Sequence, residues 1–233
     1  MSRTLSIVGA GRVGTSLGKH LRARGWRIGA VVTRSQSTAR AAVRRIGAGT
    51  PLAAAGPLRG SELQLRHKAF RKRGALAPED SALAQLLSSH HILFATPDDV
   101  MPAVAQSLAD ALRNSAGPHA LRGKVALHAS ATLDRSALAP LAQLGAATGS
   151  LHPMQAFGGK VIPSLKGVIF GIEGDPAARR LARRLARSLG GIPVVIETAD
   201  KPAYHAAAVM AGGGIYPLLE ASLQLLISVG FTR

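Results

Sequence analysis

A glycine-rich loop close to the start of the chain has the composition and spacing of a loop that binds a dinucleotide pyrophosphate. It separates a short apolar segment, 4–8, from a segment with helical spacing of its apolar residues, 15–24. Gly9 permits a tight turn, Gly11 lets the backbone approach a phosphate, and Gly14 lets helix and strand pack closely. The helix N-terminus would present free N–H groups to the anion, whereas a structural turn without a ligand is the alternative. The predicted binding residues are Gly9, Ala10, Gly11, Arg12, Val13 and Gly14.

The end of the next predicted strand favours NADP over NAD as that dinucleotide. The strand covers 26–33, and its last residue and the two that follow stand where an NAD-binding protein usually has Asp or Glu. An arginine at this place can pair with a 2′-phosphate, and Ser35 can donate a hydrogen bond to it. The alternative for Arg34 is a solvated surface side chain. We therefore predict that Thr33, Arg34 and Ser35 bind NADP.

A third predicted strand, at 92–96, should lie where the order of the parallel strands reverses. Loops at the carboxyl ends of such strands line the cofactor crevice. We expect Thr96 and Pro97 to contact the cofactor. Asp98 and Asp99 come next, and a role in capping the following helix is the alternative for them.

Several side chains could supply the proton transfer that must accompany hydride transfer to or from such a cofactor. His128 and His152 each stand at the end of a predicted strand, and Ser130 follows the first of them. Lys201 and His205 are four residues apart, which puts both on one face of a helix. We predict that these five residues form the catalytic site, with Lys201 or His205 as proton donor or carboxylate anchor.

A metal site is the competing interpretation for the three histidines of this set. No nearby carboxylate and no paired-histidine spacing supports it, so no metal is predicted. His90 and His91 precede an apolar segment and are interpreted as part of a connection, and His67 lies in a basic run and is expected to be solvated.

Strand and helix patterns alternate along most of the chain. Strands are predicted at 4–8, 26–33, 92–96, 125–129, 146–151, 168–172 and 193–196, and helices at 15–24, 35–46, 78–89, 100–113, 136–144 and 175–189. This order predicts an α/β fold, a Rossmann-type mostly parallel sheet with helices on both faces. The domain would cover 1–198, with an insertion at about 51–78 that holds no clear strand; a boundary near 150 is the alternative. From 199 to 233 the pattern is helical only, which predicts a short C-terminal dimerisation or substrate segment.

The charge of the chain favours anionic partners without choosing one. There are 29 basic residues against 12 acidic residues, a net charge of +17. Abundant arginine and alanine also accompany GC-rich genomes. Five arginines at 179–187 alternate with leucines, and a solvated basic helix face is favoured over a nucleic-acid contact. Because aromatic residues make up only 3% of the chain, little is left for base stacking, and no specific nucleic-acid partner is predicted.

Other protein classes are excluded by what the sequence lacks. It contains no cysteine, which rules out thiol chemistry, disulfides and thiolate metal sites. No uninterrupted run approaches the ~18 apolar residues of a membrane span. The nearest segment, 206–229, is broken by a glycine triplet, Pro217 and Glu220. We therefore expect a cytoplasmic protein without a membrane partner.

Four segments carry a resemblance to a known group of proteins. They are the glycine loop, Ala-Thr-Pro-Asp-Asp at 95–99, Gly-Ser-Leu-His-Pro-Met-Gln at 149–155 and Lys-Pro-Ala-Tyr-His-Ala-Ala-Ala at 201–208. In this order they resemble bacterial Rossmann-like NADP oxidoreductases with an uncharacterised C-terminal helical domain, within the pyrroline-5-carboxylate reductase and deazaflavin-dependent reductase superfamily. The resemblance implies a helical domain like that of 6-phosphogluconate dehydrogenase, which commonly builds a homodimer. It covers nearly the whole chain outside 51–78.

The predicted activity is hydride transfer between NADP and a small carbonyl, imine or hydroxy acid, with a carboxylate as the expected substrate type. The His-Pro-Met segment at 152–154 also resembles prephenate dehydrogenases, which is one alternative. A non-catalytic NADP sensor is another, because the family's Ser-Asn pair is replaced by Ala-Gly-Gly-Gly at 211–214. Each glycine weakens a helix by ~1 kcal/mol relative to alanine. The early end at Arg233 suggests either that a partner subunit covers the helix or that the chain is truncated.

Overall fold

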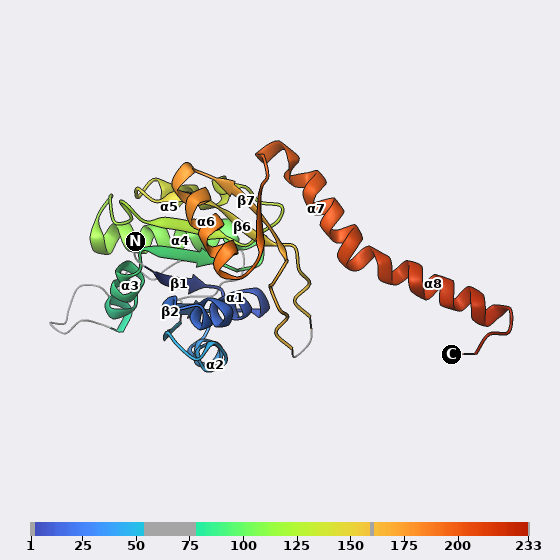
Figure 1. Ribbon diagram of the computed structural model, residues 1–233. Coiled ribbons are helices and arrows are strands. Elements are labelled where there is room, and N and C mark those ends of the chain that lie inside the picture. Colours follow the sequence, from blue (N-terminus) through green and yellow to red (C-terminus); the bar gives the residue numbers. More distant parts are fainter. Residues whose placement is uncertain (1–2, 54–77, 159–160, 233) are drawn as a thin grey trace.

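The computed structural model describes residues 3–53, 78–158 and 161–232. It shows an α/β body from which one long helical segment projects (Figure 1). The predicted fold class is confirmed: a mostly parallel sheet carries helices on both faces, and a helical region follows it.

The sheet of the described chain has eight strands in the order β3-β2-β1-β4-β5-β6-β7-β8. The strands are β1 (Thr4–Val8), β2 (Arg27–Thr33), β3 (Thr50–Ala53), β4 (His91–Phe94), β5 (Val125–His128), β6 (Ala147–Pro153), β7 (Ile169–Gly174) and β8 (Ile192–Val195). All pairs are parallel except β6 with β7, which is antiparallel. The carboxyl ends of β1, β2, β4, β5 and β6 therefore meet at one edge of the sheet.

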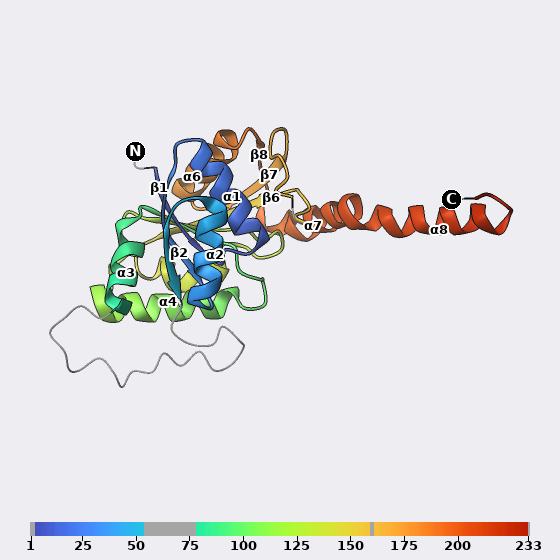
Figure 2. The same ribbon diagram turned by 90° about the horizontal axis from the view of Figure 1, so that it is seen from below.

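Helices cover both faces of the sheet. They are α1 (Arg12–Ala23), α2 (Gln36–Ile46), α3 (Pro78–Ser88), α4 (Met101–Ala116), α5 (Ala139–Ala142) and α6 (Pro176–Ser188). Leucines of α1 and α6 pack on one face with Leu5, Ile7 and Leu127, whereas α4 and α5 pack on the other with Val8 and Phe94. Alternate residues of β1 thus supply both cores, as the period of a strand requires. Figure 2 shows α4 and α6 on opposite sides of the molecule.

One strand lies in a segment for which no strand is predicted from the sequence. Thr50–Ala53, at the start of the predicted insertion, forms β3 and pairs in parallel with β2 at the edge of the sheet. Pro51 argues against a strand in the sequence, because proline is rare in central strands. It is tolerated here because β3 is an edge strand. Residues 54–77 of the insertion, and with them His67, lie outside the described residues.

The helix predicted at 136–144 is divided in the structure. A 3₁₀ turn, Arg135–Leu138, precedes the four-residue α5. Pro140 explains the division, since it has no N–H to donate to the carbonyl group four residues earlier.

The C-terminal helical run continues through its glycines. It consists of α7 (Lys201–Val209), a π-helical segment (Met210–Gly214) and α8 (Ile215–Ser228). The glycines expected to weaken the helix adopt this wider turn just before Pro217, which cannot donate the next backbone hydrogen bond. The glycines therefore change the pitch of the helix without ending it.

The side chains of α8 lie in solvent. Its apolar residues include Tyr216, Leu218 and Leu225, which are 71%, 69% and 69% exposed. One run of the described chain, Thr198–Ser228, is long and apolar enough to cross a membrane by length and composition. These two criteria are weak support for a membrane span, because a helix that packs against another subunit satisfies them as well.

Candidate functional site

The glycine loop lies where the strand order reverses, between β2 and β4 on either side of β1. Gly9 has a φ of +88°, and a Cβ atom there would lie 2.6 Å from the backbone nitrogen of Thr96. A Cβ atom at Gly14 would collide with the carbonyl oxygen of Gly9. Both glycines are therefore required by the close packing of β1, α1 and the end of β4.

Gly11 has a different environment, because a Cβ atom there would meet nothing within 4 Å. It is the N-cap of α1, no side chain caps this end of the helix, and the first turn holds no acidic residue. The first N–H groups of α1 are thus free of side-chain acceptors and face open space beside Gly11. A pyrophosphate fits this arrangement.

The residues predicted to select NADP lie at the end of β2. Ser35 is the N-cap of α2 and accepts a hydrogen bond from the Thr38 N–H at 3.2 Å. The Thr33 hydroxyl donates to the carbonyl oxygen of Ser35 at 2.9 Å, which fixes the turn. Arg34 is exposed on this turn, so its guanidinium can reach a phosphate beside the α2 N-terminus.

On the other side of the loop, Thr96 and Pro97 follow β4. The Thr96 hydroxyl oxygen is buried and has no hydrogen-bond partner among the described residues. Asp98 does not cap α4, whose N-cap is Val100 and has no side-chain cap. Its carboxylate instead accepts hydrogen bonds from the hydroxyls of Ser130 and Thr132, both at 2.6 Å. Asp98 therefore ties the loop after β4 to the loop after β5.

His128 is fully buried at the end of β5. Its Nδ1 accepts a hydrogen bond from the Ser130 N–H at 3.3 Å, so in the neutral ring Nε2 donates to the Asp134 carbonyl at 3.0 Å. Burial, and then the charge of Lys201, lowers the pKa of His128 to about 4. Both ring nitrogens are thus engaged by the backbone of the loop that carries Ser130.

Lys201, the first residue of α7, is buried against the sheet. Its Nζ donates to the hydroxyl of Ser150 at 3.1 Å and lies 4.0 Å from Oε2 of Glu173. Ser150 and Glu173 are register partners across the antiparallel pair β6 and β7. The side chains of Lys201 and Glu173 are only 4% and 5% exposed. Burial lowers the pKa of Lys201 and raises that of Glu173, while the charge of each opposes the shift of the other.

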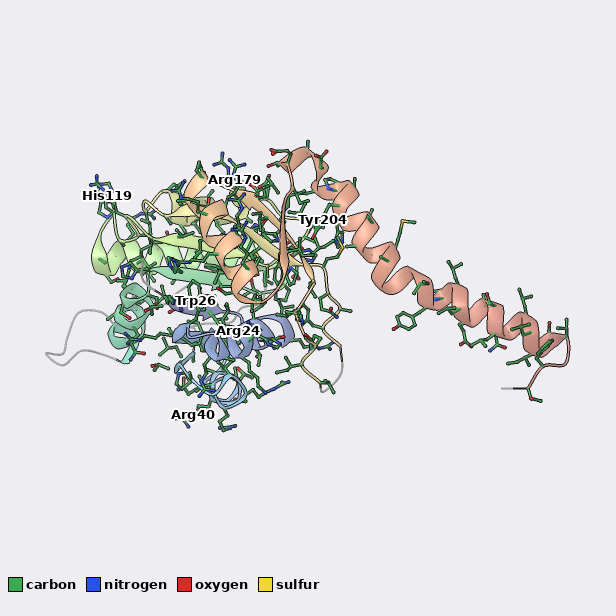
Figure 3. All side chains as sticks on the ribbon, in the orientation of Figure 1. Arg24, Trp26, Arg40, His119, Arg179 and Tyr204 are labelled. Atoms are coloured by element: carbon green, nitrogen blue, oxygen red, sulfur yellow. The ribbon has the colours of Figure 1, made fainter. Side chains whose placement is uncertain are left out.

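His152, two residues beyond Ser150 on β6, contacts Tyr204 of α7. Its Nδ1 lies 2.9 Å from the Tyr204 hydroxyl, and the two rings are nearly perpendicular. Burial, and then the charge of Lys201, lowers the pKa of His152 to about 4, so the ring is neutral and shares a hydrogen bond with the Tyr204 hydroxyl. Gly171 of β7 makes room, because a Cβ atom there would lie 2.7 Å from the Tyr204 oxygen. Figure 3 shows Tyr204 where α7 meets the sheet.

His205 completes this arrangement. Its Nδ1 is buried and has no hydrogen-bond partner among the described residues. Its charge is one of the causes that lower the pKa of His152, so the two rings are electrostatic neighbours. We call the following residues the polar cluster: His128, Ser150, His152, Glu173, Lys201, Tyr204 and His205.

The structure thus brings four of the five predicted proton-transfer residues into the polar cluster, with Ser130 beside His128, and adds three residues that the sequence did not single out. Ser150, Glu173 and Tyr204 all contact a predicted site residue directly. Glu173 had a signal in the sequence, since it interrupts an otherwise apolar strand. Within the described ranges, no group of three or more metal-ligating side chains is placed to hold a metal ion.

Comparisons with known proteins agree with the fold. A family model described as a domain of unknown function, DUF2520, matches residues 168–233. No curated protein matches. Among solved structures, a candidate NADP oxidoreductase from Bacteroides fragilis is 16% identical, with a TM-score of 0.67 over 99% of this chain and 74% of its own.

Two further solved structures are enzymes with a cofactor bound. A reductive aminase from Aspergillus terreus in complex with NADPH and ethyl-5-oxohexanoate is 20% identical, with a TM-score of 0.60 over 99% of this chain and 67% of its own. A prephenate dehydrogenase from Aquifex aeolicus in complex with NAD⁺ is 16% identical, with a TM-score of 0.56 over 86% of this chain and 62% of its own. At these sequence identities, the similarity to the three structures shows a shared fold and nothing further.

Proposed function

We propose that this chain is an NADP-dependent oxidoreductase that transfers a hydride between the nicotinamide and a small carbonyl, imine or hydroxy acid. One observation carries the proposal: the glycine loop after β1 and the polar cluster beside β5 and β6 lie at the same edge of the sheet. Dinucleotides bind at this edge of open α/β sheets, at the point where the strand order reverses. The NADP-linked and NAD-linked enzymes of similar fold support it.

The proposed cofactor residues lie in the glycine loop and at the ends of the strands on either side of it. The N–H groups at the start of α1 would hold the pyrophosphate, and Arg34 with Ser35 would hold the 2′-phosphate. The buried Thr96 hydroxyl lacks a partner and would donate to the cofactor near the nicotinamide end. When bound, the nicotinamide supplies or accepts the hydride, and the protein provides position and protons.

Lys201 is assigned as the group that holds or donates the proton of the reacting atom, or anchors a substrate carboxylate. Ser150 and Glu173 fix its ammonium group, and both are themselves buried. His205 stands one turn further along the same helix, and its free Nδ1 makes it the second candidate for this role. His128 and Ser130 are assigned to positioning, because both are engaged with the loop and with Asp98.

The long C-terminal helix is assigned to a homodimer interface. A standard interface takes about 20–30 residues from each side, and residues 209–228, all of which are exposed, provide 20. Polar residues of α8 recur at Glu220, Gln224 and Ser228, one helical stripe, and apolar residues cover most of the remaining circumference. A second copy of the chain could bury that apolar surface, which is consistent with the predicted cytoplasmic location.

Two other functions are favoured by single features. A non-catalytic NADP sensor is favoured by the π-helical segment Met210–Gly214, which offers no polar side chain to a substrate. A prephenate-dehydrogenase-like activity is favoured by the His-Pro-Met segment at 152–154. Turnover of any carbonyl or imine acid separates the first from the main proposal, and the substrate that is turned over separates the second.

Calorimetric titration with NADPH and NADH tests the proposal. We expect tighter binding of NADPH, and in Arg34→Ala a loss of about 10- to 100-fold, which corresponds to a hydrogen bond to a charged group worth about 1.5–3 kcal/mol. Arg40→Ala is the matched control, because Arg40 is also an exposed arginine at the start of α2. If neither nucleotide binds, the proposal fails.

The catalytic assignment has its own test. Lys201→Ala and His205→Ala should reduce NADPH oxidation with a panel of carbonyl and imine acids while NADPH affinity stays unchanged. If both variants keep full turnover, the assignment of these two residues is wrong even if the cofactor binds.

A further inference from the structure

One face of the molecule is strongly basic. The helices that cover it, α1, α2 and α6, hold eleven basic residues and no acidic residue. We call this surface the basic face; its members are Arg12, Lys19, Arg22, Arg40, Arg44, Arg45, Arg179, Arg180, Arg183, Arg184 and Arg187. Eight of the eleven are exposed, and the other three are partly buried. Figure 3 labels two of its members, Arg40 on α2 and Arg179 on α6.

The opposite face differs in composition. The sequences of α3, α4 and α5 hold three acidic residues and one basic residue. A general excess of arginine in the protein would fall on the helices of both faces alike. The contrast between the two sets of helices therefore calls for an explanation specific to α1, α2 and α6.

Positive charges on this face also lie close to one another. Arg184 packs over the ring of Trp26 at 4.8 Å, and the nearby charge of Arg3 is one cause, after burial, that lowers the pKa of Arg184. The guanidinium of Arg22 lies against Gly47, at the end of α2. Neighbouring helices pack about 8–10 Å apart, which is within the Debye length of about 8–10 Å near physiological salt. The charges of α1 and α2 therefore act together on an anion in solution, and Arg184 of α6 adds its charge beside Trp26, just after α1.

The chemistry of this face identifies the class of anion. Large exposed apolar residues occur at β7, β8, Val161 and from Val209 onward, but not on α1, α2 or α6 among the described residues. A helix that lies on a membrane surface inserts such side chains, so an anionic lipid surface fits poorly. With few aromatic residues for stacking, a single strand fits poorly as well. A continuous line of phosphates, presented without base contacts, fits best.

We propose that the basic face binds the phosphate backbone of a nucleic-acid duplex without reading its sequence. This function is separate from hydride transfer, because only Arg12 of the eleven basic residues belongs to the glycine loop, and no residue of α6 is assigned to the cofactor. It implies that the chain is held at nucleic acid.

Fluorescence anisotropy with labelled 20-base-pair duplexes tests this proposal, with DNA and RNA of the same sequence in separate arms. Each phosphate contact contributes about 0.9 to the slope of log affinity against log salt. The double variant Arg180→Gln/Arg187→Gln removes two exposed charges from α6. We expect its slope to fall by about 1.8 and its affinity at 0.1 M salt to drop by about 60-fold if both contacts are lost.

The matched control is Arg113→Gln/Arg122→Gln, which has the same net charge but alters α4 and the loop after it. Its affinity should stay within about threefold of the unmodified chain. Binding of either duplex with this difference between the variants supports the proposal. Equal losses in the two variants, no duplex binding at 50 mM salt, or binding to phosphatidylserine vesicles in place of duplexes would overturn it. The NADPH affinity of Arg180→Gln/Arg187→Gln should equal that of the unmodified chain, because neither residue is assigned to the cofactor, so the two proposals can fail separately.

Discussion

The buried His128 ring should make the protein lose stability in mild acid. Its pKa falls from 6.5 to about 4 in the folded chain. Between these values the unfolded chain binds a proton that the folded chain does not, so the free energy of unfolding decreases as the pH falls from 6.5 to 4. A shift of about 2.5 units at 1.36 kcal/mol per unit gives a loss of about 3 kcal/mol. For a chain of this length, that corresponds to a fall in Tm of about 6–12 °C.

Urea unfolding at pH 7 and pH 4 measures this loss. His128→Gln cannot titrate, yet its amide can accept from the Ser130 N–H and donate to the Asp134 carbonyl, as the ring does. We expect this variant to lose about 3 kcal/mol less than the unmodified chain over the same pH range. His119→Gln is the control, because His119 is exposed. The reasoning is refuted if His128→Gln and the unmodified chain lose the same amount.

Three further predictions concern the glycine loop and the polar cluster. Gly14→Ala should destabilise the fold by about 1–3 kcal/mol in urea unfolding, because its Cβ atom overpacks the site. Gly11→Ala should leave the stability nearly unchanged but weaken NADPH binding in calorimetry. Equal effects of the two variants on stability would contradict the packing argument. Glu173→Gln should lower the free energy of unfolding by about 3–5 kcal/mol, because it leaves the buried Lys201 ammonium without its counter-charge. Adding Lys201→Met should restore part of this stability. Strict additivity in this double-mutant cycle would exclude coupling between the two residues. Tyr204→Phe should cost about 1–3 kcal/mol by leaving the Nδ1 atom of His152 without its hydrogen-bond partner. An unchanged unfolding midpoint would show that this bond contributes nothing.

The alternation of strands and helices was predictable because both periodicities are strong in this sequence. Apolar runs such as 92–96 and the capped helix that begins after Ser35 are local signals, and the structure has elements at both places. β3 was missed because its pairing depends on the neighbouring β2, while its own sequence contains a proline. The division around Pro140 was missed because helical spacing of apolar residues continues across it. At both places the secondary structure is determined by the surrounding elements and by proline, and not by the local spacing of apolar residues.

The candidate site, like the fold, could be predicted from the sequence only in part. The ends of parallel strands are predictable as functional positions, and Thr96 and Ser130 lie there. Glu173 could not be placed, because it reaches Lys201 only through the antiparallel pairing that sets it opposite Ser150. A shift of one residue in that register would turn Glu173 to the other face of the sheet. The register depends on packing between β6, β7 and α6, which is not a local property of the sequence.

The histidines show why residue type and position alone do not assign a role. His128 and His152 look equivalent in the sequence, since each follows an apolar strand, and burial lowers the pKa of each to about 4. However, both ring nitrogens of His128 form hydrogen bonds with backbone groups, whereas Nδ1 of His152 forms its hydrogen bond with the side chain of Tyr204. A ring with both nitrogens bonded to the backbone can only position its loop. His152 instead joins the end of β6 to α7 through its hydrogen bond to Tyr204.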